Sequence, residues 1–241
     1  MITIKNYYLI IRERIYVGVK LFLIRHGQTK WNVEGRYQGD RNIELNQVGI
    51  KQAKLAAKYL SKVEFANIYS SPLKRTLYTA EILKGRRDLE IKVREDLKEM
   101  KFGRWEGLKF LEINEQYHQD YQDWLEDPYN NRPTGGENFK EITTRTTAEI
   151  DRIVSENTDG SSVAVVAHGG VILSLLVYWL QIPLSRWKSI IQRQGAINIA
   201  VIDKGYPYIS AINYTGHLKP IYDDTEDKVI KIYSSLRNNE K

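Results

Sequence analysis

Two short apolar runs, each leading into a histidine and a glycine, constrain the fold of this chain most. The first occupies residues 21–24 and ends on Arg25-His26-Gly27, and the second occupies residues 163–167 and ends on His168-Gly169-Gly170. Apolar runs of this length are typical of strands buried on both faces, as in the parallel sheet of an α/β protein. Ligands of such sheets bind at the carboxyl ends of the strands. The pattern therefore predicts that both histidines lie in one site at one edge of the sheet.

The charge balance favours an anionic ligand for that site. The chain has 36 Lys and Arg residues against 30 Asp and Glu, a formal net charge of +6. Arg25 lies beside His26, and a guanidinium binds phosphate or carboxylate through two parallel hydrogen bonds. The basic residues are scattered, without the basic and aromatic stripe of a nucleic-acid surface, so we expect no nucleic-acid partner. Without any cysteine, the chain has no disulfide, thiolate metal ligand or cysteine nucleophile.

The order of apolar segments and breaks suggests one domain with short additions at both ends. Residues 1–20 are assigned to an N-terminal extension, either an added edge strand or a poorly ordered leader. Residues 21–220 are assigned to the domain and residues 221–241 to a charged C-terminal tail. Within the domain, residues 103–136 are rich in aromatic and acidic side chains and are expected to form a cap over the sheet edge. The stretch holding Tyr7 to Ile11 is too short for the core of a signal peptide.

No segment approaches the ~18–20 apolar residues that a membrane span requires. We therefore expect a cytoplasmic protein without a membrane partner. A homodimer is left open.

Helix and strand signals alternate through the domain, which predicts an α/β fold. Asn46 and Asn138 are expected to cap helices, and Ser71 with Pro72 is expected to start a helix that ends at Gly85. Arg75 lies in the first turn of that helix, where an anionic ligand is favourable. Strands are expected at the following ranges: 65–70, 91–93, 197–202 and 209–212.

Several motifs then occur in an order and spacing that resemble the histidine phosphatase superfamily, the phosphoglycerate-mutase-like proteins. They are Arg25-His26-Gly27-Gln28-Thr29-Lys30-Trp31-Asn32, Gln38-Gly39, Leu45-Asn46-Gln47-Val48-Gly49, Ser70-Ser71-Pro72-Leu73-Lys74-Arg75-Thr76, Leu97-Lys98-Glu99-Met100, Gly103-Arg104-Trp105-Glu106-Gly107 and Ala167-His168-Gly169-Gly170. The resemblance extends from about residue 21 to about residue 213. It implies a three-layer α/β/α sandwich with a mostly parallel central sheet and a cap insertion.

The resemblance also implies a role for each of five residues. His26 is the nucleophile that takes the phosphoryl group, because a neutral imidazole nitrogen attacks near neutral pH. Arg25, Arg75 and His168 surround the phosphate and neutralise its charge. Glu99 is the proton donor to the leaving oxygen and later the base toward water.

Further phosphate-binding or substrate-binding positions are carried over from the same motifs. They are Asn32, Gln38, Gly39 and Gly169. The resemblance implies no metal and no cofactor, and the partner it implies is a small phosphorylated substrate.

Within the family the motifs favour a phosphatase over a mutase. Glu99 follows Arg75 closely, without the long segment containing tyrosine and lysine that closes over the substrate in the mutases. The run Gly103-Arg104-Trp105-Glu106-Gly107 resembles the phosphatase branch, including α-ribazole phosphatases and broad-specificity phosphatases. We expect a metal-independent phosphomonoesterase of the histidine acid-phosphatase type. The alternatives are a phosphoglycerate mutase and a catalytically idle relative that binds a phosphorylated ligand.

Overall fold

Parallel strands form the centre of the sheet, and antiparallel strands complete one edge. The computed structural model describes residues 17–221, which contain the following strands: β1 (Val19–Arg25), β2 (Phe65–Ser70), β3 (Ile91–Val93), β4 (Ser162–Ala167), β5 (Ile197–Asp203) and β6 (Tyr206–Tyr214). Their order is β3-β2-β4-β1-β5-β6. β4 is parallel to both β1 and β2, and β2 is parallel to β3. β5 is antiparallel to β1, and β6 is antiparallel to β5. The mostly parallel sheet is therefore confirmed.

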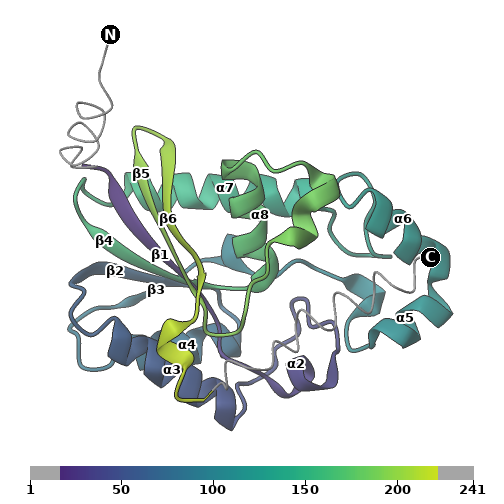
Figure 1. Cartoon of the computed structure of the whole chain (residues 1–241), viewed down its shortest axis with the longest axis horizontal. Helices are drawn as coiled ribbons and strands as arrows, with labels where there is room; N and C mark the ends of the chain where they lie inside the picture. Colours follow the sequence, from purple (N-terminus) through teal and green to yellow (C-terminus); the bar gives the residue numbers. More distant parts are fainter. Residues whose placement is uncertain (1–16, 222–241) are drawn as a thin grey trace.

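Helices cover both faces of this sheet (Figure 1). The α-helices of the described residues are α2 (Lys30–Glu34), α3 (Gln47–Tyr59), α4 (Lys74–Lys84), α5 (Phe110–Gln116), α6 (His118–Glu126), α7 (Phe139–Ser155) and α8 (Gly169–Trp179). Successive side chains of a strand point to opposite faces, and β1 shows this alternation. Leu21 and Leu23 pack in a hydrophobic cluster with α7 and α8. Phe22 and Ile24 pack in a second cluster with α3 and α4. This arrangement confirms the expected three-layer sandwich.

The cap region is closed at its base by hydrogen bonds between its two ends. Arg104 N donates to Thr134 O at 3.0 Å, and Glu137 N donates to Lys101 O at 2.8 Å. Between these bonds lie α5 and α6, beyond the sheet in Figure 1. Trp105, Tyr121 and Trp124 are buried and pack on one another and into the same cluster as α7 and α8. These three aromatic residues of the cap therefore form part of the core.

Local capping signals were correct at two helices and wrong at a third. Asn46 accepts a hydrogen bond from Gly49 N, and Asn138 accepts one from Glu141 N, as expected of N-caps. The helix expected to start at Ser71 and Pro72 instead begins at Lys74, with Leu73 as its cap. Ser71 N still donates to Val166 O at 3.1 Å, so this residue continues the sheet pairing and the chain turns two residues later.

The ends of the domain differ slightly from the expected boundaries. Val19 and Lys20, assigned to the extension, already belong to β1, where Lys20 pairs with Ser162 of β4. The remainder of the extension, residues 1–16, and residues 222–241 of the tail lie outside the described part of the chain. None of the helices in residues 17–221 is both long enough and apolar enough to cross a bilayer.

Candidate active site

The register of the two central parallel strands brings the two histidines together. Arg25 is the register partner of Ala167, so the next residues along the strands, His26 and His168, are also neighbours. His26 N donates to Ala167 O at 3.0 Å, and the imidazole centroids lie 5.1 Å apart. Both side chains are fully buried. The structure thus places the two predicted histidines in one site at the carboxyl edge of the sheet.

A single backbone contact determines which nitrogen of His26 carries the proton. Its Nδ1 lies 2.7 Å from Gly27 O, and a carbonyl oxygen only accepts, so Nδ1 carries the proton. Burial lowers the pKa of His26 well below its usual value, and the charges of Arg75 and Arg25 lower it further. The imidazole is therefore neutral near pH 7, and its Nε2 has a free lone pair. This is the state that a nucleophile requires.

His168 has partners inside the protein at both ring nitrogens. Arg75 Nε donates to its Nδ1 at 3.2 Å, and its Nε2 lies 2.8 Å from Ser71 Oγ. Because Nδ1 accepts, Nε2 carries the proton and donates to Ser71. Burial and the charge of Arg75 lower the pKa of His168 well below its usual value. A contact from this histidine to a phosphate, as expected above, would require its Nε2–H to leave Ser71.

Arg75 is held rigidly, yet it retains donors for a ligand. Besides its bond to His168, Nη1 donates to Arg41 O at 2.6 Å and Nη2 donates to Gly39 O at 2.7 Å. A guanidinium has five N–H donors, so one on each Nη is left for an anion. Burial lowers the pKa of Arg75 to about 10, opposed by the charges of Glu99, Asp40 and Glu106. The group is therefore still cationic at neutral pH.

Glu99 reaches the same site from the loop after β3. Its Oε1 accepts from Met100 N at 2.9 Å and from Gly170 N, in the first turn of α8, at 3.0 Å. Oε2 accepts only a longer bond of 3.3 Å from Gly170 N. Arg145 of α7 holds the loop by donating to the carbonyl oxygens of residues 96, 98 and 99. One carboxyl oxygen is thus fixed by two backbone N–H groups, and the other has only the longer contact.

Arg25 lies against the start of α8. Its Nη1 donates to Gln192 O, which orients the guanidinium. A Cβ atom at Gly169 would lie 3.1 Å from the Arg25 Cζ, so the glycine permits this close approach. The structure therefore places Gly169 at the site through its contact with Arg25.

Thr29 connects the two amide side chains expected to bind the substrate. Its Oγ1 lies 3.1 Å from Asn32 Oδ1 and 3.0 Å from Gln38 Oε1. Thr29 N also donates to Asn32 Oδ1, in the capping box of α2. Both amide oxygens therefore have partners, and both NH2 groups are left as donors. Donors without acceptors suit an anionic ligand.

Sequence reasoning missed Ser71 and Thr29, which orient His168 and the two amides. Both residues are part of the quoted motifs, but their roles depend on contacts with residues distant in the sequence or on an adjoining loop. Glu106 is a further carboxylate near the site, beside Gly39. It pairs with Arg41 Nε at 3.0 Å, and its Oε1 accepts from Phe102 N.

Within residues 17–221, no group of three or more His, Asp or Glu side chains is arranged to hold a metal ion.

The chain belongs to the histidine phosphatase superfamily, branch 1, whose family model matches residues 21–215. Phosphoserine phosphatase 1 of Hydrogenobacter thermophilus is 32% identical over 204 residues, which cover 85% of this chain and 96% of that protein. Adenosylcobalamin/alpha-ribazole phosphatase of Salmonella typhimurium is 30% identical over 202 residues, or 84% of this chain and all of that protein. The solved structure of YhfR from Bacillus stearothermophilus has a TM-score of 0.79 at 32% identity, covering 83% of this chain and 99% of that one. Both of these relatives are named as phosphatases, which supports an enzyme of this class.

Proposed function

We propose that this protein hydrolyses small phosphomonoesters without a metal ion, through a phosphohistidine formed at His26. The observation that carries the proposal is the buried, neutral imidazole whose Nδ1–H is bound to Gly27 O, which leaves Nε2 as the nucleophile. Arg75 and Arg25 provide positive charge beside it. A neutral nucleophile among fixed cations suits attack on a phosphate dianion, because the charge of the phosphoryl oxygens is stabilised throughout transfer.

In the first step, His26 Nε2 forms a bond to phosphorus while the ester P–O bond breaks. The leaving oxygen takes a proton from Glu99 in its acid form, so the alcohol departs neutral. Oε2 is the oxygen that exchanges this proton, since Oε1 is held by two backbone N–H groups. Arg75 binds the phosphoryl oxygens through its two remaining N–H donors, and His168 acts by orienting Arg75.

In the second step, Glu99 takes a proton from water as the water oxygen forms a new bond to phosphorus. The N–P bond breaks, which releases inorganic phosphate and restores neutral His26 and protonated Glu99. The same carboxyl serves as acid and then as base, so no second titrating group is needed.

The test uses p-nitrophenyl phosphate in the presence of excess chelator. We expect turnover without added bisphosphoglycerate, release of free phosphate and an acid-labile phosphoenzyme. His26→Ala should abolish both turnover and phosphoenzyme, whereas His118→Ala, an exposed histidine of α6, should retain them. Loss of wild-type activity on chelation would overturn the metal-independent mechanism. Transfer of phosphate between positions of phosphoglycerate, without net release, would indicate the mutase alternative.

A further inference from the structure

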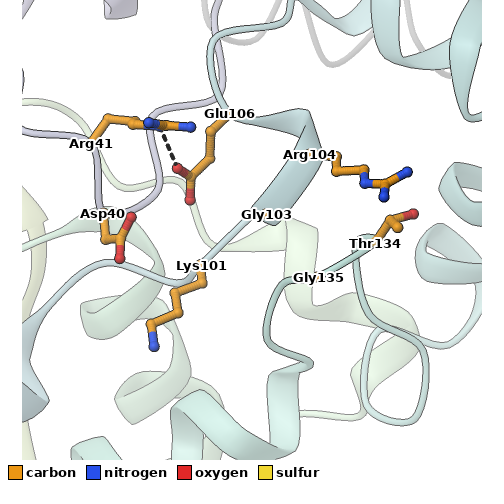
Figure 2. A pocket seen from close by; sticks show the side chains of 8 residues that line it. All are labelled: Asp40, Arg41, Lys101, Gly103, Arg104, Glu106, Thr134 and Gly135. Atoms are coloured by element: carbon orange, nitrogen blue, oxygen red, sulfur yellow. Dashed lines mark ion pairs between the residues drawn. The ribbon is translucent and has the colours of Figure 1, made fainter.

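A charged cavity lies beside the proposed phosphate site and plays no part in the mechanism above. Its volume is about 420 Å³. It is lined by the loop after Gly39, by the segment that follows Glu99 and by the end of the cap: Asp40, Arg41, Lys101, Gly103, Arg104, Glu106, Thr134 and Gly135 (Figure 2). The part of a substrate that extends beyond the phosphate would lie in this cavity.

Two chain segments connect the cavity to the catalytic groups. Arg75 binds the carbonyl oxygens of Gly39 and Arg41, so the wall that carries Asp40 is attached directly to the phosphate-binding guanidinium. On another wall, Lys101 lies two residues after Glu99, whose carboxyl group would protonate the leaving oxygen. An alcohol leaving from a phosphate between these groups therefore has this cavity as its neighbour.

Three charged side chains of the cavity form no ion pair within the described part of the chain. Glu106 is paired with Arg41 (Figure 2). Among the described residues, Lys101 and Arg104 have no ion pair, and neither has Asp40. Glu137, the carboxylate whose pKa is influenced by Lys101, is itself paired with Arg145 at 2.8 Å. Two cations and one anion are thus available to a ligand.

The positions of these charges distinguish their roles. In Figure 2, Lys101 and Asp40 lie on the same side of Gly103, whereas Arg104 extends toward Thr134 on the other side. Lys101 and Asp40 are also the two nearest in sequence to Glu99 and Gly39. A small alcohol that leaves the phosphate site would meet these two first, and Arg104 would be reached only by a longer one.

We propose that the cavity is the subsite for the leaving group and that it selects phosphomonoesters of amino or hydroxy acids. Lys101 is the specificity-determining residue. This inference rests on the proposed function. Lys101 pairs with the carboxylate of the alcohol. Asp40 accepts a hydrogen bond from the neighbouring ammonium or hydroxyl group. A phosphomonoester of an alcohol without a carboxylate leaves the Lys101 ammonium without a partner and is a poorer substrate.

The experiment compares kcat/KM for O-phosphoserine and O-phosphoethanolamine, which share the ammonium and differ by the carboxylate. A hydrogen-bonded charge pair is worth about tenfold or more in kcat/KM, so we expect phosphoserine to be preferred by at least that factor. Lys101→Met should reduce this preference at least about tenfold, and Lys101→Arg should restore much of it. Lys54→Met, an exposed lysine on α3, is the matched control and should leave the preference as in the wild type.

The p-nitrophenyl phosphate rate separates this proposal from the proposed function. A wild-type protein that turns over the aryl phosphate but does not distinguish the two alkyl phosphates would overturn the subsite and leave the phosphatase standing. A Lys101→Met variant that loses the same factor on all three substrates would also overturn it, because the lysine would then serve the fold or the chemistry. Failure of the wild-type protein on all three substrates, including the aryl phosphate, would overturn the proposed function itself.

Discussion

Glu99 is fixed at one oxygen and open at the other, which suits a group that must give up and regain a proton. An alcohol of high pKa must be protonated as the P–O bond breaks, whereas nitrophenolate departs nearly unaided. Glu99→Gln should therefore slow phosphorylation of His26 by an alkyl phosphate on the order of a hundredfold more than by nitrophenyl phosphate, the usual range for a general acid. Single-turnover release of alcohol or phenol measures this step without the later hydrolysis.

Two other results of that experiment would each assign the acid differently. Equal losses on both substrates would indicate that Glu99 positions the phosphate and transfers no proton. No loss on either substrate would indicate that a residue other than Glu99 is the general acid. Glu106 would then be the next candidate; its carboxyl lies against Gly39, held by Arg41 and by Phe102 N.

The proposed catalytic residues could be picked out because their motifs are local, whereas their orienting partners could not. His26, Arg75, Glu99 and His168 all lie in the quoted motifs, and the structure brings all four together. Ser71, in contrast, was interpreted as a helix cap from its neighbour Pro72. Its hydroxyl instead contacts His168, which is 97 positions away and joined to it only through the pairing of β2 with β4. Such a partner is visible only once the sheet is known.

The N-terminus of α8 serves the site through its glycines. A Cβ atom at Gly170 would lie 2.4 Å from Glu99 Oε1, a flexible side-chain end that would have to move. Alanine is the better helix former by up to about 1 kcal/mol, so Gly170→Ala should keep or raise the free energy of unfolding. It should nevertheless reduce turnover of alkyl phosphates about tenfold or more, because a general acid works only from hydrogen-bonding distance. Urea unfolding and the alkyl-to-aryl rate ratio together test this. A normal ratio in a stable variant would show that Glu99 does not depend on this contact.

At the level of the elements, the positions of the strands could be predicted from the sequence. The starts of the helices could be predicted only in part. The apolar runs of β1 and β4 are unbroken because both faces of each strand are buried, by α7 and α8 on one side and by α3 and α4 on the other. Caps such as Asn46 and Asn138 act within a single turn, so the sequence contains the whole interaction. The start of α4 depends on a sheet hydrogen bond to Val166, which no local pattern reveals.

At the level of the whole molecule, the sheet and its two helical layers bury two imidazoles in the neutral state. The pKa values of His26 and His168 are both lowered, chiefly by burial, whereas in the unfolded chain each is about 6.5. Below that pH the unfolded chain takes up a proton at each histidine, and the folded chain does not. The unfolded state then binds more protons, so the free energy of unfolding falls as the pH falls. Burying His26 and His168 in the neutral form thus makes the fold less stable in acid.

The size of this effect can be measured with one substitution. Each buried neutral histidine lowers the free energy of unfolding by up to about 1.4 kcal/mol per pH unit, once the pH is below the unfolded pKa. His26→Ala removes one such histidine, so the slope between pH 6 and pH 5 should become shallower by about that amount. Urea unfolding at pH 7.5, 6 and 5 gives the slopes, with His118→Ala as the control for loss of an exposed histidine. Identical slopes for wild type and His26→Ala would mean that folded His26 takes up its proton as readily as the unfolded chain does. In that case the imidazole would be charged in mild acid, and its Nε2 would no longer be the free nucleophile that the mechanism requires.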